Sequence, residues 1–309
     1  MSNITYLPME FDYTFYQEQT PAARYMDVKE ALAHYVNLGK KRGAAGSPLA
    51  DMNFFVAYLN AQHFPRILEI GPGVSPRMIG ENVSYYDVRS GENFLEYARS
   101  KGVTNTDALP TIHFSSEDGR LKDIPLKFDL IFSSHCIEHT YDFITHVNDV
   151  EALLNKNGIF AMVVPDKRYT FDYFRRLTSL GEIIARHYDV TPGHPLRDFI
   201  DSLVMAHNDP VRHWQNDHGR ITKLDHEMIT NALDKYRSTQ AMDPSLHSWV
   251  FTSDSFREVV SQLADTEMIR LAPLRVYNTV KNSNSFCTLL MRKEDIDERR
   301  KCLSNEGIA

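Results

Sequence analysis

The segment from Ile67 to Gly73, Ile-Leu-Glu-Ile-Gly-Pro-Gly, constrains the fold of this chain more than any other. Its apolar half predicts a buried strand, and its glycines predict a tight turn where that strand ends. Gly71 and Gly73 would also let the backbone approach a ligand closely. The segment therefore predicts an α/β fold with a ligand at the carboxyl end of its first strand.

A second strand that ends in an acidic residue is predicted shortly after the glycine turn. The segment from Val83 to Asp87 predicts another strand, and it closes on a carboxylate. An acid about 20 residues after a glycine turn typically accepts hydrogen bonds from ribose hydroxyls. Together, the turn and Asp87 predict a binding site for a cofactor that contains a nucleoside.

Strand-like and helix-like segments alternate from residue 66 onward, which predicts a parallel sheet covered by helices. The alternation stops after Pro165 for about 80 residues. It resumes with the strand-like segment 249–251, after which Thr252 is a plausible helix cap. The predicted strands of the sheet are 66–70, 83–88, 111–114, 128–133, 159–164, 268–277 and 285–291, and the helices beside them are 92–100, 142–155 and 253–263.

Four regions are expected along the chain. A helical segment precedes the first strand, and an insertion rich in His, Arg and aromatic residues forms a helical cap. The boundaries are 1–65 for the N-terminal helical segment, 66–165 and 247–292 for the cofactor-binding domain, 166–246 for the cap and 293–309 for a charged, frayed tail. Helices are predicted at 22–41 and 49–62 in the first region and at 171–187, 196–206 and 223–236 in the cap.

Composition narrows the classes of partner. A net charge of -7 provides no basic field for nucleic acid or anionic membranes, which favours small or neutral substrates. Three widely separated cysteines suit a reducing cytosol, so no disulfide is expected. The chain lacks the features of a signal peptide, and no apolar run approaches the roughly 20 residues of a membrane helix. We therefore expect a soluble, cytoplasmic protein.

Two cofactor classes use a glycine turn followed by an acid, namely nicotinamide dinucleotides and S-adenosylmethionine. The dinucleotide fingerprint needs a third glycine and a helix amino terminus facing a pyrophosphate, but residues 74–77 after Gly73 are Val-Ser-Pro-Arg. Glu69 would repel a pyrophosphate and suits an amino-bearing ligand better. These features favour S-adenosylmethionine and leave a nicotinamide oxidoreductase as a distant alternative.

Over roughly residues 66–165 and 247–292, the chain resembles the class I S-adenosylmethionine-dependent methyltransferases. The glycine turn resembles the first motif of that family, Asp87 its ribose-binding acid, and Glu-Asp-Gly at 117–119 its adenine-contacting motif. Segments 128–139 and 157–160 resemble its fourth strand with the following helix and the turn before its fifth strand. The chain departs from the family pattern by lacking a long first helix and a third glycine.

This resemblance implies a seven-stranded, mostly parallel Rossmann-like sheet with S-adenosyl-L-methionine as the cofactor. The residues expected at the cofactor are Glu69, Gly71, Pro72, Gly73, Asp87, Val88, Glu117, Asp118 and Ser134. Segments 74–82, 164–172 and 247–252 also resemble a bacterial methyltransferase subgroup often associated with surface-polysaccharide and glycosyl-transfer pathways. That narrower resemblance implies polysaccharide biosynthesis as the context and a sugar as the acceptor.

Three residues are candidates for moving a proton. A hydroxyl acceptor needs a base that takes its proton as the oxygen attacks. His135 lies just past the fourth strand and is the first candidate, and His139 is one helical turn further on. One of the two histidines could instead cap or pack the helix. Asp166, directly after the fifth strand, is expected to assist, or else to cap the segment that begins near Lys167.

The cap contains candidate acceptor contacts and many histidines. A basic and aromatic pair after Asp166 could bind an anionic acceptor, or could simply be solvated. The segment 212–219 has the composition of a carbohydrate pocket, although its tryptophan could instead make a helix–helix contact. The residues predicted to bind the acceptor are Arg168, Tyr169, His213, Trp214 and His218. The histidines of the cap and its exit could hold a metal ion, but they show no paired i, i+4 spacing and the sequence contains no CxxC motif, so we expect no metal.

The sequence thus predicts methyl transfer from S-adenosylmethionine to a small polar acceptor, such as a sugar or sugar-nucleotide hydroxyl. One alternative is N-methylation or phosphoryl-O-methylation of a natural product or phosphorylated metabolite, for which an ionised acceptor needs no base. Another is a non-catalytic, cofactor-binding subunit of a glycan-assembly complex.

Overall fold

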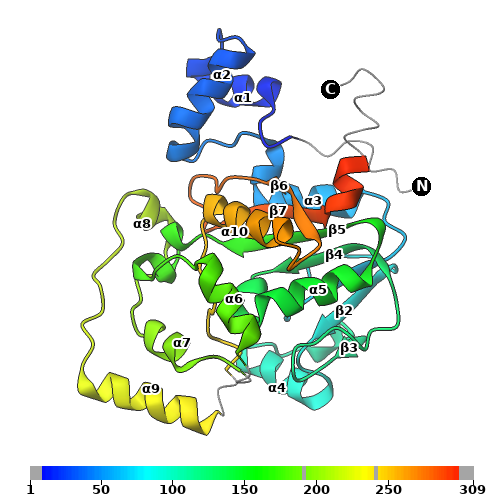
Figure 1. The fold of residues 1–309 in the computed structure, drawn as a ribbon, viewed down its shortest axis with the longest axis vertical. Helices are drawn as coiled ribbons and strands as arrows, with labels where there is room; N and C mark the ends of the chain where they lie inside the picture. The colour runs from blue at the N-terminus through cyan, green and yellow to red at the C-terminus, as the bar shows by residue number, and fades with distance from the viewer. Residues whose placement is uncertain (1–8, 190–192, 240–242, 299–309) are drawn as a thin grey trace.

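A seven-stranded sheet forms the centre of the computed structural model, which describes residues 9–189, 193–239 and 243–298 (Figure 1). The strand order is β3-β2-β1-β4-β5-β7-β6, and β7 pairs antiparallel with both of its neighbours while the other pairs are parallel. The strands are β1 (Ile67–Ile70), β2 (Val83–Asp87), β3 (Phe114–Ser115), β4 (Phe128–Ser134), β5 (Leu154–Pro165), β6 (Leu271–Val276) and β7 (Ser285–Arg292). The predicted mostly parallel, seven-stranded sheet is confirmed.

Helices cover both faces of this sheet. Consecutive residues of a strand point to opposite faces, so β1 contributes to two separate cores. Leu68 packs in a cluster with residues of α5 (Phe143–Leu153) and α10 (Ser253–Asp265). Ile67 packs on the other face, in a cluster with α3 (Met52–Ala61). Figure 1 shows α5 and α10 in front of the strands.

The helix predicted after β2 and the helix-capping residue predicted at Thr252 are both present in the structure. α4 (Gly91–Ser100) follows β2, and Thr252 caps α10 by accepting a hydrogen bond from the amide of Ser255. The connection between β1 and β2 contains no helix. β3 is shorter than predicted, and segment 249–251 forms a single bridge, between Asp166 and Phe251, instead of a strand.

The helix predicted at 22–41 is divided in the structure. A 3-10 turn (Pro21–Ala23) ends before Asp27, and α2 (Val28–His34) then continues as a π turn (Tyr35–Gly39). A separate helix, α1 (Tyr13–Gln19), precedes them. The prediction was wrong because Asp27 starts a new helix: its side chain accepts from the amide of Glu30, whose carboxylate accepts from the amide of Asp27.

The cap consists of short helices joined by long connections. They are α6 (Leu180–Tyr188), α7 (Leu196–Asp201), α8 (Pro210–Trp214) and α9 (His226–Ser238). Figure 1 shows α9 at the outer edge of the molecule, and it packs against α7 through Phe199 and Ala232. Part of the expected cap, residues 190–192 and 240–242, lies outside the described residues.

The helix predicted at 171–187 is also divided. A 3-10 turn at Phe171–Phe174 is followed by extended chain, and α6 begins only after a capping box between Ser179 and Glu182. The extended stretch exists because Arg175 and Thr178 bond across to the backbone of residues 247 and 250. Tertiary hydrogen bonds thus override the local helical pattern.

Residues 293–298 at the end of β7 are helical, whereas a frayed tail was expected from residue 293. Asp295 is buried and accepts a hydrogen bond from the amide of Asn157, which secures this end to the start of β5. The rest of the tail, including Cys302, lies outside the described residues. Cys136 and Cys287 are free thiols. In the described part of the chain, no helix is long and apolar enough to cross a membrane.

Candidate functional site

The glycine turn lies at the point where the strand order reverses. β1 has β2 on one side and β4 on the other, and open α/β sheets bind ligands outside the carboxyl ends of such strands. Gly71 and Gly73 have φ of +68° and +54°, which favour glycine. A Cβ on Gly71 would lie 3.2 Å from Sγ of Cys136. The turn thus presents a narrow cradle of backbone, in which an added methyl group on Gly71 would press against Cys136.

Glu69 holds this turn from below. Its carboxylate is 2% exposed and accepts hydrogen bonds from the backbone amides of Arg77 and Met78, at 2.9 to 3.1 Å. These bonds organise the β1–β2 connection in the absence of a helix. Glu69 therefore supports this loop by accepting hydrogen bonds from its backbone amides, and the predicted contact of Glu69 with an amino-bearing ligand remains untested. Burial raises the pKa of Glu69 to about 7.

Asp87 ends β2 beside the glycine turn. Its buried carboxylate accepts hydrogen bonds at Oδ1 from the amide of Arg89, at 3.0 Å, and from the Arg89 guanidinium, at 3.4 Å. That guanidinium lies 4.3 Å from the centroid of the Tyr97 ring, and the Tyr97 hydroxyl would be 3.9 Å from a Cβ on Gly73. Sequence reasoning missed both residues: Arg89 bonds locally to Asp87 two residues before it, and Tyr97 reaches the turn only through the folding of α4.

The acidic motif after β3 lies next to the end of β2. Asp118 accepts hydrogen bonds from the Ser116 hydroxyl and from the amide of Arg120, and Glu117 is exposed. A Cβ on Gly119 would lie 3.9 Å from Cγ1 of Val88, so the motif and β2 are neighbours. The structure thereby brings the predicted cofactor residues to one edge of the sheet, where Pro72 is buried and Ser134 ends β4.

His135 follows β4 in a left-handed backbone conformation, with φ of +52°. Its amide donates to the carbonyl of Val163, and its Nε2 lies 2.7 Å from the Ser285 hydroxyl oxygen. The Ser285 hydroxyl itself donates to Asn284. The side chain is 38% exposed but has protein on most sides, and this desolvation lowers the pKa of His135 to about 4. His135 is therefore neutral and accessible at neutral pH.

Glu138 is the most unusual residue at this edge. Its side chain is fully buried, and neither carboxylate oxygen has a hydrogen-bond partner among the described residues. Three imidazoles surround Oε1: His135 Nδ1 at 3.6 Å, His139 Nε2 at 3.7 Å and His247 Nε2 at 4.0 Å. Burial raises the pKa of Glu138 to about 7. Sequence reasoning named His135 and His139 but missed Glu138 between them.

His139 and His247 are each held by a hydrogen bond at the ring nitrogen that does not face Glu138. Nδ1 of His139 lies 3.0 Å from the carbonyl of Leu246 and must donate to it. Nδ1 of His247 lies 2.6 Å from Oδ2 of Asp172. Burial lowers the pKa of His139 to about 3. Burial also opposes protonation of His247, but the hydrogen bond and charge of Asp172 outweigh it and raise the pKa of His247.

Asp166 is held by side chains at the end of β5. It is completely buried, it caps a 3-10 turn (Lys167–Tyr169), and it accepts hydrogen bonds from the Arg168 guanidinium at 2.6 to 3.2 Å and from the Thr279 hydroxyl at 2.6 Å. The helix-cap alternative for Asp166 therefore describes its geometry, and the predicted catalytic role remains untested. Arg168 is likewise engaged by Asp166.

The predicted acceptor residues of the cap make contacts with one another. Tyr169 stacks on Trp214 with centroids 3.9 Å apart, and the Trp214 indole donates to the carbonyl of Ser283. His213 and His218 meet through their Nδ1 atoms at 2.9 Å. The alternative interpretation of Trp214 as a packing residue fits these contacts, and they keep the cap against the β6–β7 connection.

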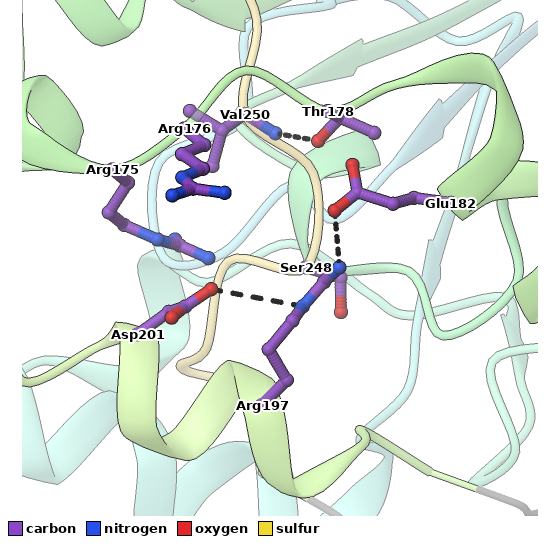
Figure 2. Close-up of a pocket in the computed structure, with 8 residues that line it drawn as sticks. All are labelled: Arg175, Arg176, Thr178, Glu182, Arg197, Asp201, Ser248 and Val250. Atoms are coloured by element: carbon purple, nitrogen blue, oxygen red, sulfur yellow. Dashed lines mark hydrogen bonds and ion pairs between the residues drawn. The ribbon is translucent and has the colours of Figure 1, made fainter.

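A pocket of about 220 Å³ opens in the cap between α6, α7 and the segment before α10 (Figure 2). Figure 2 shows the guanidinium groups of Arg175 and Arg176 on one side, and the ion pairs of Arg197 on the other. Arg175 donates to Asp172 and to the carbonyl of His247, while its buried Nε has no partner among the described residues. The pocket thus borders the histidine cluster and is rich in positive charge.

Solved methyltransferase structures resemble this chain in fold. An S-adenosylmethionine-dependent methyltransferase from Clostridium acetobutylicum aligns over 85% of this chain and 98% of its own, with 12% identity and a TM-score of 0.40. The CcbJ methyltransferase from Streptomyces caelestis covers 78% of this chain and 93% of its own, with 12% identity and a TM-score of 0.39. An S-adenosylmethionine-dependent methyltransferase from Aquifex aeolicus covers 91% of this chain and 97% of its own, with 13% identity and a TM-score of 0.37.

No protein-family model and no curated protein sequence matches the chain. The strand order and the residues at the carboxyl edge of the sheet are the observations from which a function is inferred.

Proposed function

We propose that this protein is an S-adenosylmethionine-dependent methyltransferase that acts on a hydroxyl of a small polar acceptor, most simply a sugar or sugar nucleotide. The observation that carries the proposal is the arrangement at the switch point of the sheet. There, the glycine turn at Gly71 adjoins a buried acid at the end of β2 and an accessible, neutral imidazole at the end of β4.

The residues at the turn fit the donor. The exposed backbone of Gly71 and the half-buried Gly73 would lie against its methionine part. Both hydrogen bonds from Arg89 end on Oδ1 of Asp87, and Oδ2 would accept from the ribose. The Val88 side chain and the acidic turn after β3 would border the adenine. Glu69 would keep the loop in place through the amides of Arg77 and Met78.

His135 is the proposed base. When bound, the donor supplies a methyl group that its sulfonium already makes electrophilic, so holding the acceptor in line is a large part of catalysis. The neutral imidazole would take the hydroxyl proton on Nδ1 as the oxygen attacks. Its lowered pKa makes it a weak base in the free protein, but the Glu138 carboxylate at 3.6 Å would stabilise the imidazolium as it forms.

The arginine-lined pocket supports an acceptor with an anionic part. Three contacts connect it to the proposed base: Arg175 with the His247 carbonyl, His247 with Glu138, and Glu138 with His135. A phosphate of a sugar nucleotide would meet the guanidinium of Arg176 beside Arg175, because guanidinium groups match phosphate geometry. In that arrangement the sugar hydroxyl would lie toward the histidines.

The proposal is tested by incubating the protein with labelled donor and a panel of sugars, sugar phosphates and sugar nucleotides, followed by mass spectrometry of the products. We expect a labelled methyl ether that is lost in the His135→Asn variant. Donor binding without any product would favour a non-catalytic subunit. Full activity of His135→Asn would favour an acceptor that is already ionised, as in N-methylation or phosphoryl-O-methylation.

A further inference from the structure

The carboxylate of Glu138 lacks the donors that a buried charge requires. Both oxygens are inaccessible to solvent and without hydrogen-bond partners in the described parts of the chain. A buried ionised carboxylate is strongly unfavourable unless it is paired or coordinates a metal. The carbonyl of Glu138 accepts from the amides of Ser248 and Trp249, so the position of the residue is fixed by the fold. Its Oε1 instead faces ring nitrogens of three histidines at 3.6 to 4.0 Å, which is too far for hydrogen bonds.

The imidazoles around Glu138 offer lone pairs where a cationic partner would lie. His139 uses its Nδ1–H on the carbonyl of Leu246, which leaves the Nε2 lone pair facing Oε1 of Glu138. His247 uses its Nδ1–H on Asp172, so its Nε2 also faces the carboxylate. Lone pairs of the two imidazoles and of the carboxylate would repel one another at this point. A metal cation between them would accept all of these lone pairs as ligand bonds.

We propose that Glu138, His139 and His247 bind a divalent first-row transition metal ion, such as Zn²⁺ or Mn²⁺, at the carboxyl edge of the sheet. One ligand atom from each residue lies within 4.8 Å of the others. Metal–ligand bonds of about 2.0 to 2.1 Å in a tetrahedral site place ligands about 3.3 Å apart. Oε1 of Glu138 lies 3.7 Å from Nε2 of His139 and 4.0 Å from Nε2 of His247, so side-chain rotations that bring the three ligand atoms together would close the site. Two imidazoles with one carboxylate form a ligand set typical of such ions.

The groups that hydrogen-bond to His139 and His247 are arranged like the groups that orient the ligands of known metal sites. A histidine that binds a metal usually donates its other N–H to a carboxylate or a backbone carbonyl, which fixes the ring. His247 does so to Asp172 at 2.6 Å, and Asp172 is held in turn by the Arg175 guanidinium at 2.8 Å. His139 does so to Leu246 at 3.0 Å. The sequence did not predict a metal because His247 is far from the other two ligands along the chain.

The metal site would define the acceptor more narrowly. Three protein ligands leave a coordination position open, as in catalytic rather than structural sites. The third imidazole near Glu138 belongs to the more exposed His135, so the open position would face the donor edge. A bound hydroxyl would lose its proton more readily. The acceptor would then be an oxygen ligand, such as an alcohol or vicinal diol. This step rests on the proposed function, whereas the metal site itself does not.

The test is metal binding by the full-length protein. Chelator-treated protein is titrated with ZnCl₂ and with MnCl₂ in a calorimeter, and metal content is measured by mass spectrometry after dialysis. We expect one equivalent to bind, with a loss of at least about a hundredfold in affinity for Glu138→Gln and His247→Asn and about ten- to a hundredfold for Asp172→Asn. The exposed His63 provides the control, His63→Asn, which should bind like the wild type.

Thermal unfolding with and without the metal shows whether each variant folds. The Glu138→Gln variant should fold, because its amide can donate to a histidine lone pair, yet it should not gain the metal-induced rise in Tm of the wild type. Equal binding by the wild type and folded Glu138→Gln would overturn the metal site. Metal binding without methyl transfer to any acceptor would support the site and count against the proposed function alone.

Discussion

A Cβ placed on Gly71 would lie 3.2 Å from Sγ of Cys136, so the turn after β1 and the residue that follows His135 border the same small space. Cys136 begins the short turn that contains Glu138 and His139. The predicted donor loop and the histidine cluster are therefore adjacent parts of one site. Substitutions in either part should affect distinct steps of the same reaction.

The Gly71→Ala variant should bind donor and product at least about tenfold more weakly, because a methyl group would narrow the cradle and φ of +68° would be strained. Gly102→Ala is the matched control, since Gly102 also has positive φ, at +81°, but open space around it. Calorimetric titration with S-adenosylhomocysteine measures both. Equal losses in the two variants would show that backbone strain alone is responsible.

The Asp87→Asn variant should weaken donor binding by about 1.5 to 3 kcal/mol, because a charged acceptor of ribose hydrogen bonds is lost. The exposed Asp123 offers a control in Asp123→Asn, which should change affinity little. Binding is measured by calorimetry at fixed pH and salt. Unaltered affinity of Asp87→Asn would exclude the ribose role.

The His135→Asn variant should lower kcat by roughly a hundredfold to ten-thousandfold while leaving donor affinity near the wild-type value, as removal of a general base does. Steady-state rates with the labelled acceptor, combined with donor titration, separate the two effects. A loss confined to donor affinity would place His135 in binding instead.

Asp166→Asn should reduce the free energy of unfolding by about 3 to 5 kcal/mol, because Arg168 and Thr279 would lose a buried charged partner. Asp254→Asn, which removes an exposed pair with Lys40, should cost less than about 1 kcal/mol. Urea unfolding measures both values. Similar small effects would mean that the Asp166 network contributes little to stability.

Stability should depend on pH through Glu69. Burial raises its pKa from 4.5 to about 7, so the folded state holds its proton more tightly than the unfolded state. Its contribution to stability is fully present below pH 4.5 and is lost as the pH rises through 7, by up to about 3 kcal/mol. In urea unfolding between pH 5 and 8, the Glu69→Gln variant should lack this decrease. Parallel curves for the two proteins would contradict the raised pKa.

The sequence predicts the sheet well because its signals are local. The strand from Ile67 and the turn at Gly71 are marked by an apolar run followed by glycines. The structure of each can therefore be predicted from neighbouring residues. The helices at 22–41 and 171–187 were wrong because Asp27 and Arg175 make hydrogen bonds that a helical periodicity does not reveal.

The cluster around Glu138 was only partly predictable. His135 and His139 follow a recognisable strand, so their place at the sheet edge could be inferred from position alone. Glu138 and His247 meet only because the amides of Ser248 and Trp249 bind the carbonyl of Glu138. Contacts between residues this far apart along the chain produce no spacing or periodicity in the sequence from which they could be predicted.

The central claim is that the switch point binds S-adenosylmethionine, and calorimetric titration of the purified protein with S-adenosylmethionine and S-adenosylhomocysteine tests it most directly. We predict one binding site for each, with affinity reduced in Gly71→Ala and Asp87→Asn and preserved in Gly102→Ala. No heat of binding from either ligand, with the protein shown to be folded, would contradict the proposed function.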